Sequence, residues 1–283
     1  MPTVSELTLY PIKSCAGIGV REATLTRAGL CVDGVHDRQW MLVDADGQFL
    51  SQREHPRMAL ITPRLLAHAL EVDAPGMPAL AIALRSAPPQ PSATRTVRVW
   101  DDSVPASDEG DASAQWFSQV IGRPCRLVRS HPDARRQASA TWTGGRAAPT
   151  MFADGFPLLL AGAASLADLN EKLAAAGRAP LPMNRFRPNI VVDGIAAFEE
   201  DYVEHFAIGA ARIVPVKPCA RCPIPSVDQA SGCVGPDPLD ILQAYRRKAQ
   251  LDDAICFGMN CLVGEGEGAR LFVGQPVEAA LAF

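Results

Sequence analysis

The distribution of apolar and polar residues along the chain predicts many short strands and few helices. Short apolar or alternating runs between turn residues are typical of strands. Asp46-Gly47 and Pro75-Gly76 each lie between two such runs, and each therefore predicts a hairpin. Further strand-like runs are TRTVRVW at 94–100, NIVVDG at 189–194, FAIGAARIVPV at 206–216, ICFGMNCLV at 255–263 and ARLFVGQPVEAAL at 269–281.

Two segments show the clearest helical periodicity. The segment 111–122 has its apolar residues on one face and ends at Gly122, a residue that commonly terminates helices. The segment 165–177 opens with Ser165, has an acidic residue three positions later and ends in a glycine. Because this resembles a capping box, we expect the helix to begin at Ser165.

Three other segments complete the pattern. The segment 236–249 offers Asp237 as N-cap and a proline as the first helical residue, so it predicts a third helix. The Pro- and Ser-rich segment 85–95 predicts a loop. The segment 130–149 has no periodicity and predicts a long loop, which in a compact domain is often functional.

Strands therefore outnumber helices, and no internal repeat or regular strand–helix alternation is visible. We predict a β-rich α+β fold, built from barrels or bent sheets with peripheral helices. The 283 residues are enough for one large domain or two modest ones.

Composition narrows the classes of function. The chain is 48% apolar and 20% charged, which is typical of a globular protein with a full core. Its net charge of −4 does not favour non-specific binding to nucleic acid or acidic membranes. No apolar run approaches the length of about 20 residues that spans a bilayer, and the N-terminus lacks the pattern of a signal peptide. We expect a cytoplasmic protein without a membrane or nucleic-acid partner. The preference for Ala and Arg over Lys indicates a GC-rich bacterial genome.

Eight cysteines are present, and without a secretion signal we expect them to be reduced. Cys219 and Cys222 form the one C-x2-C pair, which leaves three interpretations open. A structural zinc site would need two more ligands, for which Cys256 and Cys261 are available. A redox dithiol would need a helix N-terminus, which the prolines after Cys222 disfavour. A single thiolate could instead bind a soft transition metal beside cations that hold an anionic cofactor.

Three stretches supply such cations. YPIKSCAG contributes Lys13 and Ser14, DGVHDRQW contributes Arg38, and MNRFRPNIVV contributes Arg185, Arg187 and Asn189. A single arginine is usually a solvated surface residue, so only the combination indicates a site.

That combination resembles a known family. The segments are, in order, YPIKSCAG at 10–17, DRQWMLVD at 37–44, FPLLLAGAASLADLN at 156–170, RFRPNIVVDG at 185–194, CARC and SVD within 219–228, and FGMN at 257–260. They are similar to MOSC proteins with an N-terminal MOSC β-barrel domain, the family of the mitochondrial amidoxime-reducing components and their bacterial relatives. The resemblance implies a MOSC β-barrel domain at 121–283 and a smaller β-rich domain at 1–120, with the site in the cleft between them.

The resemblance also implies a molybdenum cofactor with Cys222 as its metal ligand and catalytic residue. The cofactor contacts that it implies are Lys13, Ser14, Arg38, Asp154, Gly155, Phe156, Arg187, Asn189, Ala220 and Arg221. The pterin phosphate suits arginine forks and a lysine point charge. Two departures are visible: Gly155-Phe156 stand where relatives often carry small hydroxyl residues, and PIPS replaces a Thr-rich stretch after Cys222.

The implied reaction is the two-electron reduction of an N–O bond in an N-hydroxylated compound, with the oxygen leaving as water. The loop at 130–149 would form one wall of the substrate channel. Because Gly264 breaks the cysteine spacing of a plant-type iron–sulfur run, a separate reductase, ferredoxin-like protein or cytochrome would supply the electrons. The alternatives are a sulfur carrier, in which a cysteine holds a persulfide, and a non-catalytic cofactor-binding protein.

Overall fold

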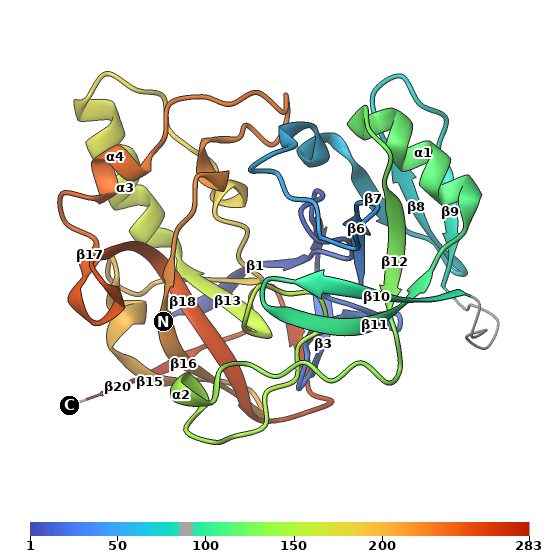
Figure 1. Cartoon of the computed structure of the whole chain (residues 1–283). Coiled ribbons are helices and arrows are strands. Elements are labelled where there is room, and N and C mark those ends of the chain that lie inside the picture. Colours follow the sequence, from blue (N-terminus) through green and yellow to red (C-terminus); the bar gives the residue numbers. More distant parts are fainter. Residues whose placement is uncertain (85–92, 283) are drawn as a thin grey trace.

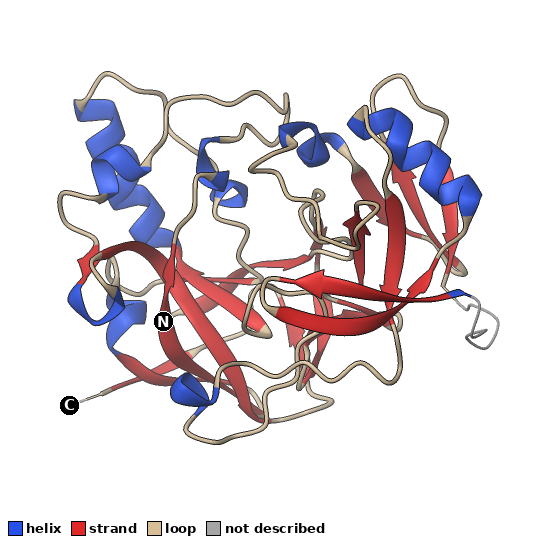
Figure 2. Cartoon of the chain, in the orientation of Figure 1, coloured by secondary structure: helices blue, strands red, loops and turns tan. Residues whose placement is uncertain are grey.

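The fold is dominated by strands, and its helices lie at the periphery (Figures 1 and 2). The computed structural model describes residues 1–84 and 93–282, so the larger part of the predicted Pro/Ser loop lies outside the described residues. Four sheets form the body of this described part. This architecture confirms the predicted β-rich α+β class.

The largest sheet has nine strands in the order β2-β1-β14-β13-β18-β16-β15-β20, with β17 paired to β18. Their bounds are β1 Thr3–Leu9, β2 Ile18–Val20, β13 Leu158–Gly162, β14 Ile190–Asp193, β15 Val203–Ile208, β16 Ala211–Ala220, β17 Arg247–Lys248, β18 Ala254–Glu265 and β20 Glu278–Leu281. Only β13 and β14 pair in parallel within this described sheet, and helix α3 (Ala163–Ala175) makes the crossover that a parallel pair requires.

Three smaller sheets complete the body, in the orders β10-β11-β12-β6, β19-β3-β4-β5 and β7-β8-β9. Their bounds are β3 Glu22–Thr26, β4 Gly29–Val32, β5 Val35–His36, β6 Trp40–Val43, β7 Thr62–Leu65, β8 Ala69–Asp73, β9 Leu80–Ala83, β10 Thr94–Val99, β11 Asp102–Asp108, β12 Arg126–Ser130 and β19 Arg270–Phe272. The hairpin predicted at Pro75-Gly76 is confirmed as β8–β9.

Strands from the two ends of the chain share sheets. The N-terminal β1 pairs with β14, and the C-terminal β19 pairs with β3. The main apolar core likewise joins Leu7, Trp40 and Phe117 to Leu160 and Ile213. The two-domain division at residue 120 stays a prediction.

The helices are few and short. Their bounds are α1 Asp111–Ile121, α2 Ala140–Thr143, α3 Ala163–Ala175 and α4 Leu239–Leu242, with 3-10 turns at Pro56–Leu60, Met183–Arg185, Glu199–Tyr202, Ile224–Ser226 and Ala249–Leu251. The prediction for α1 is confirmed, including its end at Gly122, which has a φ of 81°. No helix within the described ranges 1–84 and 93–282 is long and apolar enough to cross a membrane.

The predicted start of α3 at Ser165 is wrong. The helix begins two residues earlier, at Ala163, with Gly162 at its N-cap. Ser165 is fully buried in the first turn, where its hydroxyl donates to the carboxylate of Glu200. The Ser165 hydroxyl therefore interacts with Glu200, which is distant in the sequence, and does not cap the helix as the local pattern predicted.

The predicted long helix at 236–249 is also wrong. Asp237 does accept a hydrogen bond from the Leu239 amide at 3.0 Å, but α4 has only four residues. Arg246 and Lys248 then form ion pairs with the buried carboxylate of Asp201. These charge pairs and the pairing of β17 with β18 hold the following segment extended.

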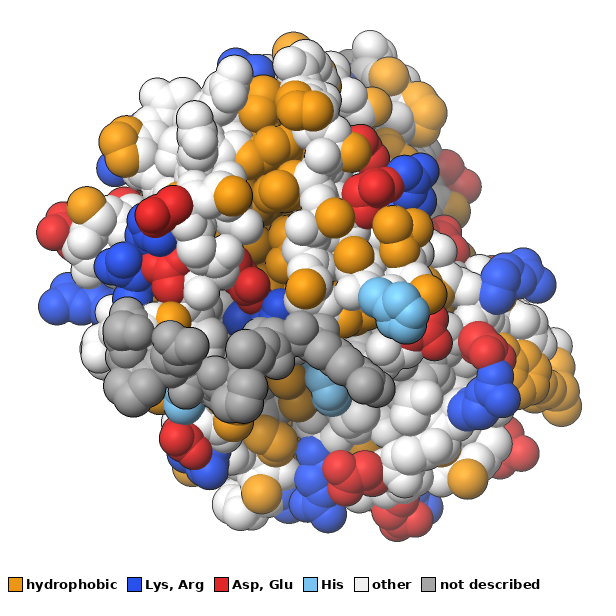
Figure 3. Space-filling view, turned by 90° about the vertical axis from the view of Figure 1, so that its right-hand side faces the viewer, with side chains coloured by type: hydrophobic (Ala, Val, Ile, Leu, Met, Phe, Trp, Pro, Cys, Tyr) orange, Lys and Arg blue, Asp and Glu red, His pale blue; other side chains and the backbone are white. Residues whose placement is uncertain are grey.

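One face of the molecule, shown in Figure 3, carries Lys and Arg side chains interspersed with Asp and Glu. Among the described residues of this face, neither sign of charge forms a dominant patch. A concentration of positive charge is found instead inside a cavity.

Candidate active site

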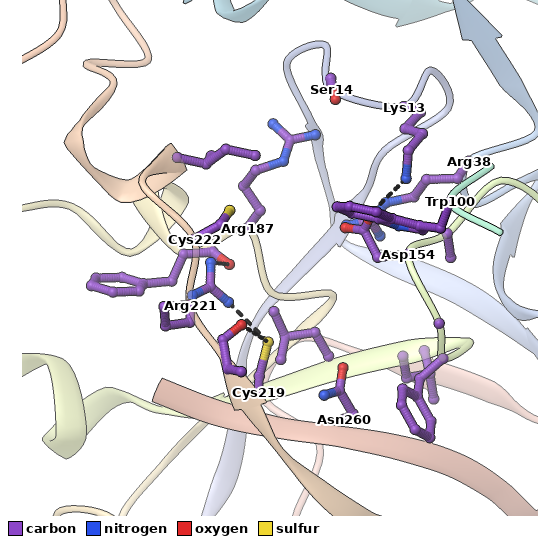
Figure 4. A pocket seen from close by; sticks show the side chains of 18 of the residues that line it. Lys13, Ser14, Arg38, Trp100, Asp154, Arg187, Cys219, Arg221, Cys222 and Asn260 are labelled. Carbon is purple, nitrogen blue, oxygen red and sulfur yellow. Dashed lines mark hydrogen bonds and ion pairs between the residues drawn. The ribbon is translucent and has the colours of Figure 1, made fainter. Parts of the chain in front are cut away.

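A cavity of about 490 Å³ is the candidate active site (Figure 4). All of the predicted site residues line it: Lys13, Ser14, Arg38, Asp154, Gly155, Phe156, Arg187, Asn189, Ala220, Arg221 and Cys222. The fold thus brings together residues that are more than 200 positions apart in the sequence, from Lys13 to Cys222. Their individual roles toward a cofactor stay predictions.

Four residues of the cavity wall have left-handed backbone conformations. Ser14, Arg38, Trp100 and Arg187 have φ angles of 64°, 50°, 57° and 57°. This conformation is strained for residues other than glycine, and such strain clusters at functional sites. The surrounding structure therefore fixes these side chains at some cost in energy.

A buried lysine marks one side of the cavity. The ammonium of Lys13 donates to the Phe152 carbonyl at 2.9 Å and to Asp154 Oδ1 at 2.6 Å. Burial lowers the pKa of Lys13, and Asp154 offsets this only in part. Desolvation raises the pKa of Asp154, but Lys13 and a hydrogen bond from Trp100 lower it more, so it lies below its usual range. The carboxylate therefore stays ionised at neutral pH.

Arg38 is held by a network of side chains behind the cavity wall. Its Nη1 donates to Asp37 and, at 3.2 Å, to Asn189 Oδ1. Asn189 in turn donates to Asp37 at 2.9 Å and accepts from the Leu159 amide at 3.1 Å. Both polar atoms of Asn189 are thus engaged within the protein. The structure supports a positioning role for Asn189, and its direct contact with a cofactor stays a prediction.

The guanidinium groups of Arg187 and Arg38 both lie over the ring of Tyr10, at 4.3 and 4.4 Å from its centroid. Arg187 Nη2 is buried and has no hydrogen-bond partner in the described part of the chain. Burial is the main cause that lowers the pKa of Arg187. Since an unpartnered buried donor is costly, this guanidinium is poised for an acceptor that the protein itself does not provide.

The other side of the cavity is formed by the end of β16. Its register against β18 shifts between Pro215 and Lys217 and again between Pro218 and Ala220. Such bulges re-aim side chains and are common next to active sites. They explain how consecutive residues up to Cys222 can all reach one cavity.

The two thiols of the C-x2-C pair differ in their surroundings. Arg221 donates to Cys219 Sγ at 3.2 Å and to the Phe186 carbonyl at 3.0 Å, while its Nε is buried without a partner. Cys222 Sγ, by contrast, has no hydrogen-bond partner within residues 1–84 and 93–282, and it too lines the cavity. Both thiols therefore reach the cavity, and the role of Cys222 as a metal ligand stays a prediction.

The cavity wall is strongly positive although the whole chain is acidic. Lining cations are Lys13, Arg38, Arg53, Arg187, Lys217 and Arg221, against two lining carboxylates, Asp101 and Asp154. Such a concentration of one sign raises the affinity for an anion.

Comparisons with known proteins place the chain in a family. A model described as the MOSC N-terminal beta barrel domain matches residues 1–124, and one described as the MOSC domain matches 147–278. Mitochondrial amidoxime reducing component 2 of Rattus norvegicus is 32% identical, covering 97% of this chain and 82% of that protein. Mitochondrial amidoxime-reducing component 1 of Homo sapiens is also 32% identical, with the same coverage. The chain belongs to this MOSC family.

Another relative has a longer chain. The molybdenum cofactor sulfurase of Bos taurus is 32% identical over 87% of this MOSC protein, which spans 29% of the sulfurase.

Several cavity residues of this MOSC protein were not predicted from its sequence. They are Arg53, Trp100, Asp101, Phe186, Lys217 and Asn260. Trp100 and Asp101 form the turn between β10 and β11, and Arg53 lies over the Trp100 ring at 4.6 Å. The strand pattern at 94–100 predicted the first strand of this hairpin, but nothing local indicated that its turn reaches the cavity.

The expected role of the loop at 130–149 is wrong. No described residue of this loop lines the cavity. Instead, Arg136 donates to the carbonyls of Met151 at 2.8 Å and Ala153 at 2.7 Å. The loop therefore supports the cavity wall from behind.

The two other interpretations of the cysteine pair gain no support. No group of three or more His, Cys, Asp or Glu residues that could hold a metal ion occurs in the described part of this MOSC protein. Cys222 is followed by the three-residue turn Ile224–Ser226 instead of an α-helix.

Proposed function

We propose that this MOSC protein is a molybdenum-cofactor-dependent oxidoreductase that reduces N-hydroxylated compounds. The observation that carries the proposal is one cavity lined by six cations and by the thiol of Cys222. The relatives named amidoxime-reducing components support the reaction class.

The residues of the cavity fit an anionic metal cofactor. Arg187 Nη2 and Arg221 Nε are buried donors without protein partners, and a phosphate or pterin acceptor would satisfy them. Lys13, Arg38 and Arg187 would hold the phosphate, while Cys222 would supply a soft thiolate ligand to molybdenum. Phe156 and Phe186 contribute apolar surface to the cavity wall.

The bound cofactor would supply the two-electron chemistry that breaks the N–O bond. The chain's own residues position and neutralise charge. The ionised Asp154 accepts hydrogen bonds from Lys13 and Trp100, so its role is to fix these two groups and not to donate a proton. Asn189 fixes Arg38 in the same way.

Metal analysis and a turnover assay test the proposal together. Protein produced with a supply of molybdenum cofactor should contain about one molybdenum per chain and reduce benzamidoxime to benzamidine with reduced methyl viologen as donor. Zinc in place of molybdenum, or full molybdenum content without turnover of any N-hydroxylated compound, would refute the reductase.

A sulfur carrier is the second candidate, favoured by the sulfurase relative and by the free Cys222 thiol. Incubation with a cysteine desulfurase and cysteine would then add one sulfur atom to Cys222, visible in the intact mass. Cofactor binding with neither turnover nor persulfide formation would indicate a non-catalytic cofactor-binding protein.

Electrons would come from a separate protein. The encounter with a reductase, ferredoxin-like protein or cytochrome would be transient, through a small interface near the cavity.

A further inference from the structure

We infer that Lys217 and Asn260 form a second anion-recognition point in the cavity, which selects substrates that carry a carboxylate or another anionic group. The inference rests on the proposed function and specifies the substrate class.

The sheet places the two residues side by side. Lys217 on β16 is the register partner of Asn260 on β18. Residues directly opposite in an antiparallel pair project from the same face of the sheet. Both line the cavity, and the bulge between Pro215 and Lys217 lies immediately before the lysine. The strand pairing thus presents an ammonium and an amide together.

Lys217 differs from the other three lysines of the chain. Lys13, Lys172 and Lys248 each form an ion pair with an aspartate. Lys217 has no carboxylate partner in the ranges 1–84 and 93–282; its ammonium lies 5.2 Å from the ring centroid of Trp142. The side chain of Asn260 likewise has no hydrogen-bond partner among the described residues.

A half-buried ammonium on an aromatic ring can be positioned without being neutralised. Trp142 belongs to α2, which packs against β16, so its ring position relative to Lys217 is fixed by the fold. The cation is consequently fixed in place while its charge remains available to a ligand.

This pair is separate from the group proposed to hold the cofactor phosphate. Figure 4 shows Asn260 and Cys219 on the strands at one side of the cavity, and Lys13 and Arg38 at the other. A cofactor phosphate held by Lys13 and Arg38 would leave Lys217 unneutralised. Lys217 is then available to an anionic group of the substrate.

Binding without turnover tests the inference. The oxidised, cofactor-loaded protein is titrated calorimetrically, without an electron donor, with benzamidoxime and with its 4-carboxy derivative. We expect the carboxylate compound to bind about tenfold more tightly, as one charge-assisted hydrogen bond allows. Lys217→Met should remove this preference and leave benzamidoxime unchanged, Lys217→Arg should retain most of it, and Asn260→Ala should weaken it.

Lys172→Met is the matched control, because it removes a lysine outside the cavity and should change neither affinity. The molybdenum content should equal that of the wild type in every variant. Three outcomes would each overturn the inference. Lys217→Met could change the affinity for both compounds equally, the protein could bind neither compound, or a variant could contain less molybdenum than the wild type. Failure of the bound compounds to be reduced when methyl viologen is added would count against the reductase and not against the anion-recognition point.

Discussion

At the scale of single residues, the two thiols of the C-x2-C pair face the same cavity with different partners. Arg221 donates to Cys219, whereas Cys222 has no protein partner in the described chain. This difference in surroundings agrees with the proposed role of Cys222 as the metal ligand.

We predict that Cys222→Ser loses most of the molybdenum and of the activity, because a hydroxyl is a much weaker donor than a thiolate. Cys219→Ser should keep much of both. Metal content by mass spectrometry and turnover with methyl viologen check this. An equal loss in both variants would instead indicate that the thiols act together.

Arg187 combines a buried charge with an unpartnered donor, Nη2, and burial lowers its pKa. We therefore predict that Arg187→Met lowers cofactor content at least tenfold. This is the change in affinity expected from the loss of one charge-assisted hydrogen bond to phosphate. The midpoint of thermal unfolding of the cofactor-free protein should stay unchanged or rise, because a costly buried charge is removed. Arg95→Met, at an ion pair that does not line the cavity, is the control. Strong destabilisation of the cofactor-free protein would show that Arg187 serves the fold.

At the scale of secondary-structure elements, the first turn of α3 depends on a carboxylate from elsewhere in the chain. Glu200 is fully buried and accepts hydrogen bonds from the Gly162 amide at 3.1 Å and the Ser165 hydroxyl at 2.8 Å. Burial raises the pKa of Glu200, and these two hydrogen bonds offset the shift only in part.

This raised pKa sets the sign of a pH effect. The folded state binds the Glu200 proton more tightly than the unfolded state does, so its contribution to stability is present below the unfolded pKa and is lost as pH rises through the folded pKa. We predict that Glu200→Gln lacks this loss. Denaturant unfolding should be measured at a series of pH values above 4.5. The free energy of unfolding of the variant, relative to that of the wild type, should rise as the pH rises. Parallel profiles for the two proteins would contradict the prediction.

At the scale of the whole molecule, the cavity exists because distant parts of the chain meet. Lys13 forms its ion pair with Asp154, and Gln52 exchanges hydrogen bonds with Gln229. The N-terminal β1 also lies within the nine-stranded sheet. Both halves therefore build the cavity walls, and neither half contains the complete site.

We predict that the purified protein reduces N-hydroxylated compounds only with a separate electron-transfer protein or an artificial donor, and that it shows no iron–sulfur absorption. Its cysteines offer no plant-type cluster run, since Gly264 occupies the position where a third cysteine would follow Cys256 and Cys261. Spectroscopy and an assay with NADH alone check this. Steady turnover with NADH, in a preparation free of other reductases, would contradict it.

The sequence by itself determined the elements whose cause is local. The strand pattern, the hairpin at Pro75-Gly76 and the end of α1 at Gly122 follow from alternation and turn residues, and the structure confirms them. The six motifs, among them those that contain Lys13 and Cys222, also sufficed to identify the family, because their order makes them specific as a set.

Only the tertiary structure decided the features that depend on contacts between distant residues. The Ser165 hydroxyl donates to Glu200, so Ser165 does not cap α3 as predicted. Arg246 and Lys248 form ion pairs with Asp201, and the helix predicted at 236–249 is only four residues long. Lys217 and Asn260 became neighbours through strand register, which no local pattern encodes. Burial and charge pairing depend on which residues folding brings together. These contacts therefore cannot be identified from the sequence until the fold is known.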